Sequence, residues 1–235
     1  MLGSMRFRRL PDGIRCRRIG AALRAMADRC AVPWREGQHS GRGRTHADAA
    51  RSRWVGCEAA ILEAMRETRA DLQRLQTLID DSIEGASAFL RSSFGMPEHS
   101  LAASQLAAHL QGALTVSLAT VTARGEPRVA PINAIFLHGQ FYLPTVAEAA
   151  RSKHVARRPS ASLAYYEGTS LAVIAHGSAV IVGDDHADFA EIDSTQTEHA
   201  QSPREWHGTG VYILFKPATL YTYAEEPERY PQAAT

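Results

Sequence analysis

The densest group of residues able to hold an anion lies between Phe141 and Tyr165 (FYLPTVAEAARSKHVARRPSASLAY). An apolar run ends at Thr145, and a predicted helix with four basic residues follows it. These residues are Arg151, Lys153, Arg157 and Arg158. Only two of the 26 basic residues in the chain are lysines, and Lys153 is one of them. Guanidinium and ammonium groups near a helix start are typical of a phosphate site.

The four basic residues cannot all reach one ligand from a single helix. Arg151 and Lys153 lie in its first half, close to Thr145, where backbone N–H groups and the helix dipole favour an anion. Arg157 and Arg158 lie further along, and we interpret them as surface charge. The alternative for the whole group is a solvated basic face.

The usual hydrolase and metalloenzyme motifs are absent. The chain has no GxSxG, HExxH, P-loop or GxGxxG motif, and its ten histidines include no pair with convincing ligand spacing. The three cysteines form no CxxC pair, so neither a zinc site nor a disulfide framework is indicated. No apolar run approaches the roughly 20 residues of a membrane helix, and no signal peptide is recognisable. We therefore expect a cytoplasmic protein.

Charge divides the chain into two parts. Residues 1–53 hold 13 arginines and 4 acidic residues, whereas residues 54–235 hold 13 basic and 21 acidic residues. The first part has too few apolar residues for a core, and we interpret it as a disordered leader. An arm that binds nucleic acid or an acidic membrane is the alternative, and it would bind with a strong salt dependence.

Residues 54–112 have a helical pattern. Apolar residues recur every three or four positions from Cys57 to Leu90, and a shorter helix is predicted over Leu101–Leu110 with Ser100 as its N-cap. We expect this segment to form a helical extension whose apolar stripe is covered by the following domain or by a partner subunit.

Residues 113–235 change to strand-like patterns separated by glycine turns. Asp184 or Asp185 is expected to cap one helix, Ala187 to about Gln196, within this region. Short turns between consecutive strands imply antiparallel pairing, so we predict a small closed or half-open barrel in an α+β chain that is mainly β. The predicted strands are Leu114–Val121, Arg128–Leu137, Gln140–Leu143, Ala161–Tyr166, Leu171–Val182 and Val211–Tyr223.

Residues 113–183 resemble the pyridoxamine 5′-phosphate oxidase-like split β-barrels that bind flavin or deazaflavin. The resemblance rests on the order of LTVSLATVTARGEPRVAPI, HGQFYL and AEAARSKHVARRPSASLAY. The tail TGVYILFKPATLYTYA is similar to the closing strand of actinobacterial members, which a tryptophan-containing loop precedes. The resemblance implies a six-stranded antiparallel split β-barrel with an N-terminal helical extension.

The resemblance also implies a cofactor site at a homodimer interface. Thr145, Arg151 and Lys153 would hold the cofactor phosphate, and Trp206 would close over the ring. The strand residues that would lie beside the isoalloxazine ring are Arg128, Pro131 and Ile132. No residue is identified as catalytic, and no metal ligand is expected.

The chain departs from true pyridoxamine 5′-phosphate oxidases at its end. The segment from Phe215 to Tyr221 lacks the arginine pair of their R-L-x-P-x-R-x-E-F-W ending, which argues against vitamin B6 as substrate. The composition and the helical lead-in resemble the deazaflavin-using branch, and both coenzyme F-420 and FMN stay open. The expected function is hydride transfer to or from a small organic substrate. The alternative is a non-catalytic flavin, deazaflavin or haem carrier or sensor, in which His176 could face the cavity.

Overall fold

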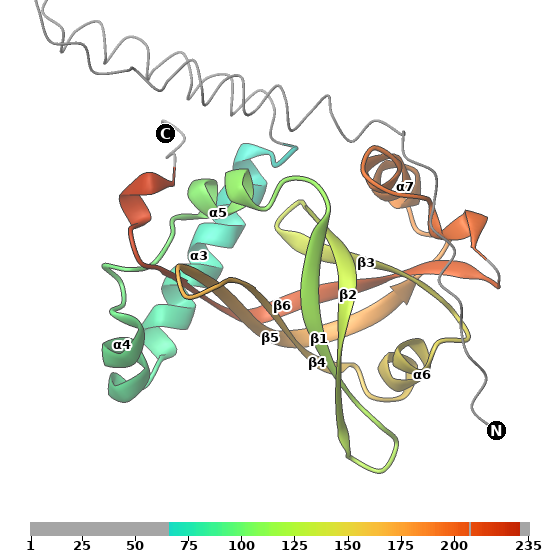
Figure 1. Ribbon diagram of the computed structural model, residues 1–235, viewed down its shortest axis with the longest axis horizontal. Coiled ribbons are helices and arrows are strands. Elements are labelled where there is room, and N and C mark those ends of the chain that lie inside the picture. The colour runs from blue at the N-terminus through green and yellow to red at the C-terminus, as the bar shows by residue number, and fades with distance from the viewer. Residues whose placement is uncertain (1–65, 207, 231–235) are drawn as a thin grey trace, which may run out of the picture. The chain divides into compact units, whose positions relative to one another are not determined.

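The computed structural model describes residues 66–206 and 208–230, and the expectations for residues 1–53 and for residues 54–65 lie outside these ranges. Within these ranges, three helices precede a six-stranded sheet (Figure 1). The helices are α3 (Arg69–Gly85), α4 (Ala88–Phe94), α5 (Ala103–His109), α6 (Ala150–Arg157) and α7 (Phe189–Thr197). The strands are β1 (Leu114–Val121), β2 (Pro127–Leu137), β3 (Gln140–Val146), β4 (Ser160–Glu167), β5 (Leu171–Val182) and β6 (Gly210–Ala224). Two 3-10 turns, η1 (Pro203–Glu205) and η2 (Pro227–Arg229), flank β6.

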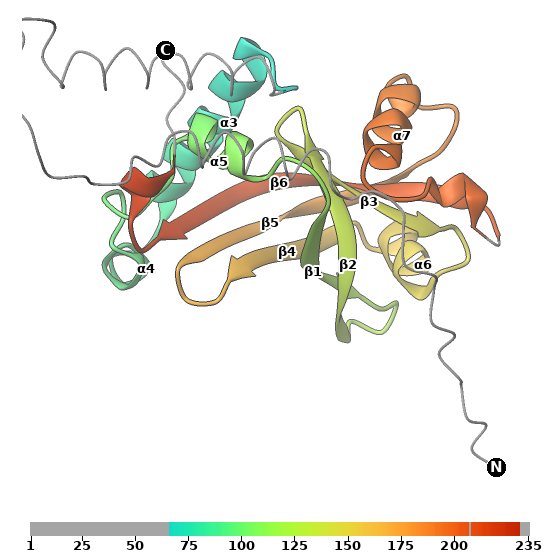
Figure 2. The same ribbon diagram turned by 45° about the horizontal axis from the view of Figure 1, so that its top comes forward.

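The strands close into a barrel in the order β1-β2-β3-β6-β5-β4, and every pair is antiparallel (Figure 2). Two-residue and other short turns join β1 to β2, β2 to β3 and β4 to β5, as their glycines predict. The expected α+β fold, a six-stranded antiparallel barrel with an N-terminal helical extension, is confirmed.

Alternation along β1 explains how one strand separates the core from the outer surface. Leu114, Val116 and Leu118 point into the barrel and are buried, whereas the residues between them are partly or fully exposed. This period of two is the pattern of a strand with one buried face. The outer surface formed by β1, β2, β4 and β5 therefore has no covering element among the described residues over much of its length.

In contrast, β3 is buried on both faces. Phe141 and Leu143 belong to the core of the barrel, while Tyr142 belongs to a second apolar cluster with Phe189 and Ile192 of α7. Its hydrogen-bonded neighbour β6 is also buried on both faces, since residues 211–215 are all buried. Because α7 covers their outer face, β3 and β6 form the most rigidly enclosed part of the sheet.

The first helix, α3, packs against the barrel along its apolar stripe. Leu75 and Ile79 are almost fully buried, and the Ser82 hydroxyl accepts a hydrogen bond from the Leu220 amide of β6 at 2.9 Å. A capping box between Thr68 and Asp71 starts the helix. No helix in the described ranges is long and apolar enough to cross a membrane.

Helix ends differ from the predicted ones. The helical pattern expected up to Leu90 breaks at Ala86, because Ser87 caps α4 through the Leu90 amide and Arg91 binds the last carbonyl groups of α3. The N-cap of α5 is Ala102 rather than Ser100. The Gln105 side-chain oxygen accepts a hydrogen bond from the Ala102 amide at 2.9 Å.

The expected caps of α7 also differ. The helix begins at Phe189 after Asp188, whereas Asp184 forms an ion pair with Arg204. The Asp184 carboxylate, which the local sequence predicts as a helix cap, therefore pairs instead with Arg204, 20 residues away.

His138 joins three elements at the β2–β3 turn. Its Nδ1 lies 3.1 Å from Asp71 Oδ2 of α3, and its Nε2 lies 3.2 Å from Glu191 Oε2 of α7. Burial disfavours the charged ring, but the bonds to the two carboxylates outweigh it and raise the pKa of His138 above its usual value. The backbone φ of 54° is one that few side chains tolerate, asparagine among them.

This geometry predicts a pH-dependent contribution to stability. A histidine with a raised folded-state pKa stabilises the fold fully below its unfolded pKa of about 6.5, and this stabilisation is lost as pH rises through the folded pKa. We expect His138→Asn, which keeps the turn, to destabilise the protein by about 1 kcal/mol at pH 6 and by less at pH 8.5. Urea unfolding at the two pH values measures both differences. His186→Asn, in an exposed loop, is the control; an equal loss for His138→Asn at both pH values would contradict the assignment.

Candidate functional site

The connection from β3 to α6 is held by hydrogen bonds to backbone carbonyl groups. The Ala147 amide donates to the Thr209 carbonyl at 2.8 Å, and the Ser152 hydroxyl donates to the Val146 carbonyl at 2.8 Å. Ser152 and Val155 form the buried face of α6. These contacts fix the start of the helix against the end of β3 and against the segment that leads into β6.

The start of α6 is open to an anion. Ala149 occupies the N-cap position, and no side chain caps the helix. A helix start without a side-chain cap leaves N–H groups for a ligand or water. Hydrogen bonds from its own amide and from Thr209 already lower the pKa of the exposed Glu148 carboxyl at this connection. The local backbone therefore stabilises negative charge.

Three of the seven predicted site residues lie along this connection and the helix that follows it. Thr145 is buried near the end of β3, Arg151 is partly buried in the first turn of α6, and Lys153 is exposed. Among the described residues, neither Arg151 nor Lys153 has a carboxylate within ion-pair distance. Lys153 nevertheless lies near enough to Glu148 to help lower the pKa of that carboxyl, so a ligand would share this cation with Glu148. By comparison, Arg158 donates to the Ala123 carbonyl at 3.0 Å.

Trp206 lies on the segment that borders this connection. It follows η1 directly and is partly buried. Four residues later, Gly210 pairs with Val146 of β3, and the Ala147 bond to Thr209 joins the same two segments. The neighbouring residue His207 lies outside the described ranges.

The three residues predicted on β2 have different surroundings. Arg128 is exposed and pairs with Glu126 at 2.7 Å, and Pro131 is exposed on the outer face. Ile132 is only 7% exposed and lies in the barrel core, so only its backbone could meet a ligand on the outer face.

The β2 residues connect to α6 through β1. Arg128 pairs across the sheet with Thr120, whose hydroxyl lies 3.0 Å from His154 Nδ1 of α6. By alternation, Arg128 and Thr120 lie on the inner side of the sheet with Ile132, whereas Val129 and Pro131 lie on the outer side. The contact therefore joins α6 to the inner side of the β1–β2 hairpin.

Sequence reasoning did not identify several side chains of the outer face. Val129 and Asn133 share the exposed side of β2 with Pro131. His176 is exposed on β5, and its Nδ1 lies 2.8 Å from the Ser162 hydroxyl, so it does not face the barrel interior, the position that the carrier alternative allowed for it. Strict alternation from the buried Leu118 across the paired strands would have placed these residues outside.

The fold is a closed, six-stranded antiparallel barrel with a basic helix between β3 and β4. The family model of pyridoxamine 5′-phosphate oxidase matches residues 102–222, just over half of the chain. The chain belongs to the pyridoxamine 5′-phosphate oxidase family. No curated protein matches it.

Solved structures similar to this chain have low sequence identity. A pyridoxamine 5′-phosphate oxidase-related, FMN-binding protein from Nostoc punctiforme is 16% identical, with 50% of this chain and 76% of that one covered and a TM-score of 0.37. HutZ, the haem storage protein from Vibrio cholerae, is 16% identical, with coverages of 46% and 85% and a TM-score of 0.42. A protein described as F420 reductase is 16% identical, with coverages of 47% and 91% and a TM-score of 0.39.

The contact between Ser152 and Val146 leads to a prediction about the site's support. We expect Ser152→Ala to destabilise the protein by about 1 kcal/mol, because the buried Ser152 hydroxyl no longer donates to the Val146 carbonyl. The exposed Ser160→Ala, at the start of β4, is the control and should change little. Urea unfolding measures both variants, and equal stabilities would show that Ser152 does not hold α6 in place.

Proposed function

We propose that this protein is a homodimeric oxidoreductase that binds coenzyme F-420 or FMN at the β3–α6 connection. The observation that carries the proposal is the uncapped start of α6 beside two cations without ion-pair partners. The family supplies the class of cofactor, and the residues at the connection supply the reason for its position.

The donor set at the connection fits a phosphate group. The first N–H groups of α6 point along the helix axis, Arg151 can form two parallel hydrogen bonds, and Lys153 adds a point charge. The Thr145 hydroxyl would add one more donor at the strand end. Both candidate cofactors carry a phosphate, so these contacts account for binding without choosing between them.

The ring would lie against the outer face of β2. Val129 and Pro131 offer an apolar surface there, and the backbone of Ile132 would border the ring while its side chain stays in the core. Arg128 precedes Val129 but lies on the other side of the strand with Thr120, so it would approach the ring only from the hairpin end. Trp206, on the segment next to the connection, would cover the ring from the other side.

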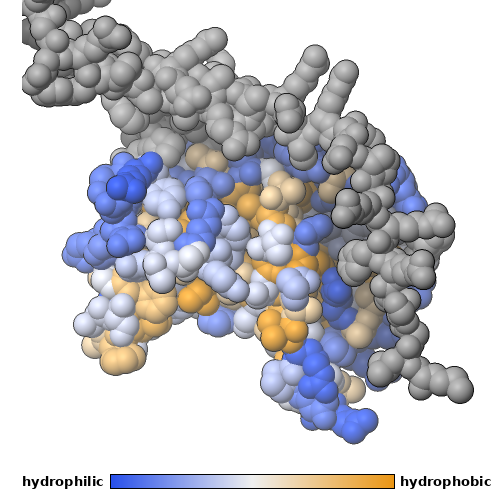
Figure 3. Space-filling model, viewed as in Figure 1, coloured by the Kyte–Doolittle hydropathy of each residue, from blue (hydrophilic) through white to orange (hydrophobic). Residues whose placement is uncertain are grey.

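A second copy of the chain would complete the site. The outer face presents Val129 at 71% and Tyr166 at 63% exposure, together with partly exposed small and apolar residues of the paired strands. Figure 3 shows hydrophobic side chains along β1 and β2 above their hydrophilic hairpin tip. Exposed apolar surface of this kind marks a protein interface, and a ring lying on it would be sheltered by the partner.

The chemistry would come from the cofactor, which transfers a hydride to or from a small organic substrate when it is bound. The protein's part is to hold the phosphate, orient the ring and exclude water.

Charge reversal tests the phosphate site. We expect Arg151→Glu and Lys153→Glu each to weaken binding of the preferred cofactor by at least about tenfold, since each removes a charge-assisted contact and adds repulsion. Absorbance titrations with FMN and with coenzyme F-420 measure the affinities and identify the cofactor. Arg157→Glu, on the same helix, is the matched control.

Two results would overturn the assignment. Wild-type affinity in both charge-reversal variants would remove the phosphate site, and failure of the wild-type protein to bind either cofactor would remove the proposed function. Turnover of the bound cofactor with an electron acceptor separates the oxidoreductase from the alternative, a non-catalytic carrier.

The dimer leads to its own prediction. A charge buried between two subunits is strongly unfavourable, so Val129→Asp should shift the protein from dimer to monomer in sedimentation analysis and lower cofactor affinity in parallel. Thr169→Asp, in the exposed β4–β5 turn, is the control. A Val129→Asp protein that stays dimeric would place the interface elsewhere.

A further inference from the structure

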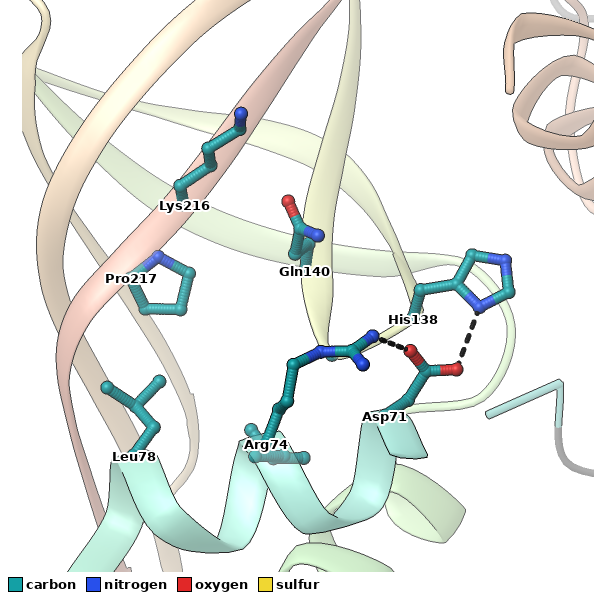
Figure 4. Close-up of a pocket in the computed structure, with 9 residues that line it drawn as sticks. Asp71, Arg74, Leu78, His138, Gln140, Lys216 and Pro217 are labelled. Carbon is teal, nitrogen blue, oxygen red and sulfur yellow. Dashed lines mark hydrogen bonds and ion pairs between the residues drawn. The ribbon is translucent and has the colours of Figure 1, made fainter. Parts of the chain in front are cut away.

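A second candidate site lies at the other end of β3. A cavity of about 340 Å³ opens between α3 and the strands β3 and β6 (Figure 4). Gln140, the first residue of β3, and Lys216 of β6 line one side, and Arg74 of α3 lines the other. Because Thr145 ends the same strand, the cavity is separate from the β3–α6 connection.

The charges around this cavity favour an anion. Asp71 is the carboxylate among its lining residues, and it already accepts hydrogen bonds from Thr68, His138 and Arg74. Burial opposes its ionisation, but these bonds outweigh burial and lower the pKa of Asp71. Lys216 has no carboxylate within ion-pair distance among the described residues. The remaining charge at the cavity is therefore positive.

Gln140 provides an independent sign of a ligand. Its side-chain oxygen Oε1 is buried and has no hydrogen-bond partner within the described part of the protein. A buried acceptor left without a donor costs about 1–3 kcal/mol. A water or another bound molecule can supply the missing donor. Because Oε1 has almost no accessible surface, the Gln140 amide has to turn toward the cavity before a ligand's hydroxyl or amino group can reach it.

The floor of the cavity is apolar. Leu75, Leu78 and Pro217 line it, and Leu75 is only 2% exposed. β6 has a bulge next to Gly177 of β5, and this bulge positions Lys216 and Pro217 at the cavity. The bulge requires a glycine at position 177, because the Lys216 carbonyl lies where a side chain would begin. A Cβ atom at Gly177 would lie 2.1 Å from that oxygen.

We propose that this cavity binds a small organic acid with an apolar body and a hydroxyl or amino donor. Lys216, with Arg74 beside it, pairs with the carboxylate, and the leucines with Pro217 enclose the body. The donor of the ligand reaches Gln140 Oε1. The cavity is large enough for a ligand of this size.

The two lysines of the chain allow a matched experiment with 4-hydroxybenzoate as the probe, measured by calorimetry on the full chain. We expect saturable binding that Lys216→Gln weakens at least about tenfold and that Lys153→Gln leaves unchanged. Gln140→Leu should abolish tight binding while raising the thermal midpoint, because it removes an unpartnered buried oxygen. That opposite pair of effects distinguishes a ligand contact from a structural role.

Several outcomes would overturn this site. They are the absence of saturable binding, an equal effect of the two lysine substitutions, and a Gln140→Leu protein that binds as well as the wild type. Binding of 4-hydroxybenzyl alcohol as tight as that of the acid would remove the role of charge. Equally tight binding of inorganic phosphate would show that the apolar floor does not contribute to ligand binding. None of these results depends on FMN or coenzyme F-420, so the two sites are tested separately.

Discussion

The structure depends on the enclosure of β3 on both of its faces. Its inner residues, Phe141 and Leu143, pack in the barrel, and its outer residue Tyr142 packs under α7. A strand buried in this way cannot shift its register without exposing one apolar set or the other. Its two ends are therefore held in fixed positions, with Thr145 next to the connection that leads to the basic helix and Gln140 at the cavity beside α3.

The same enclosure explains why the covered and the uncovered parts of the barrel have different roles. Where α7 covers the sheet, the outer side chains of β3 and β6 are apolar and buried, and His138 joins α7 to α3 at the β2–β3 turn. Where no described element covers the sheet, the outer face carries Val129, Pro131 and Tyr166 in the open. The covered part supports the site, and the open part supplies the surface on which a ring and a second subunit would lie.

Strands were predicted well from the sequence because their signal is local. Alternation and glycine turns identified β1 and β5 with their observed bounds, and the basic helix was identified by its charges. The burial of Ile132 also follows from alternation, once its strand is paired.

Helix ends and the second cavity were not predicted, because they depend on partners far away in the sequence. Asp184 pairs with Arg204 instead of capping α7. Ala102 is the N-cap of α5 in place of Ser100, because the Gln105 side chain accepts a hydrogen bond from its amide. Gln140 and Lys216 are 76 residues apart and meet only through the pairing of β3 with β6. No local pattern marks either residue as part of a site.

The central claim is that the start of α6 holds the phosphate of a flavin-type cofactor. A crystal structure of the protein with the cofactor it prefers tests this claim most directly. The account predicts the phosphate at the first turn of α6, in contact with Thr145, Arg151 and Lys153, with the ring on the outer face of β2 between two subunits. A phosphate bound beside Lys216, or a ring bound inside a monomer away from β2, would contradict it.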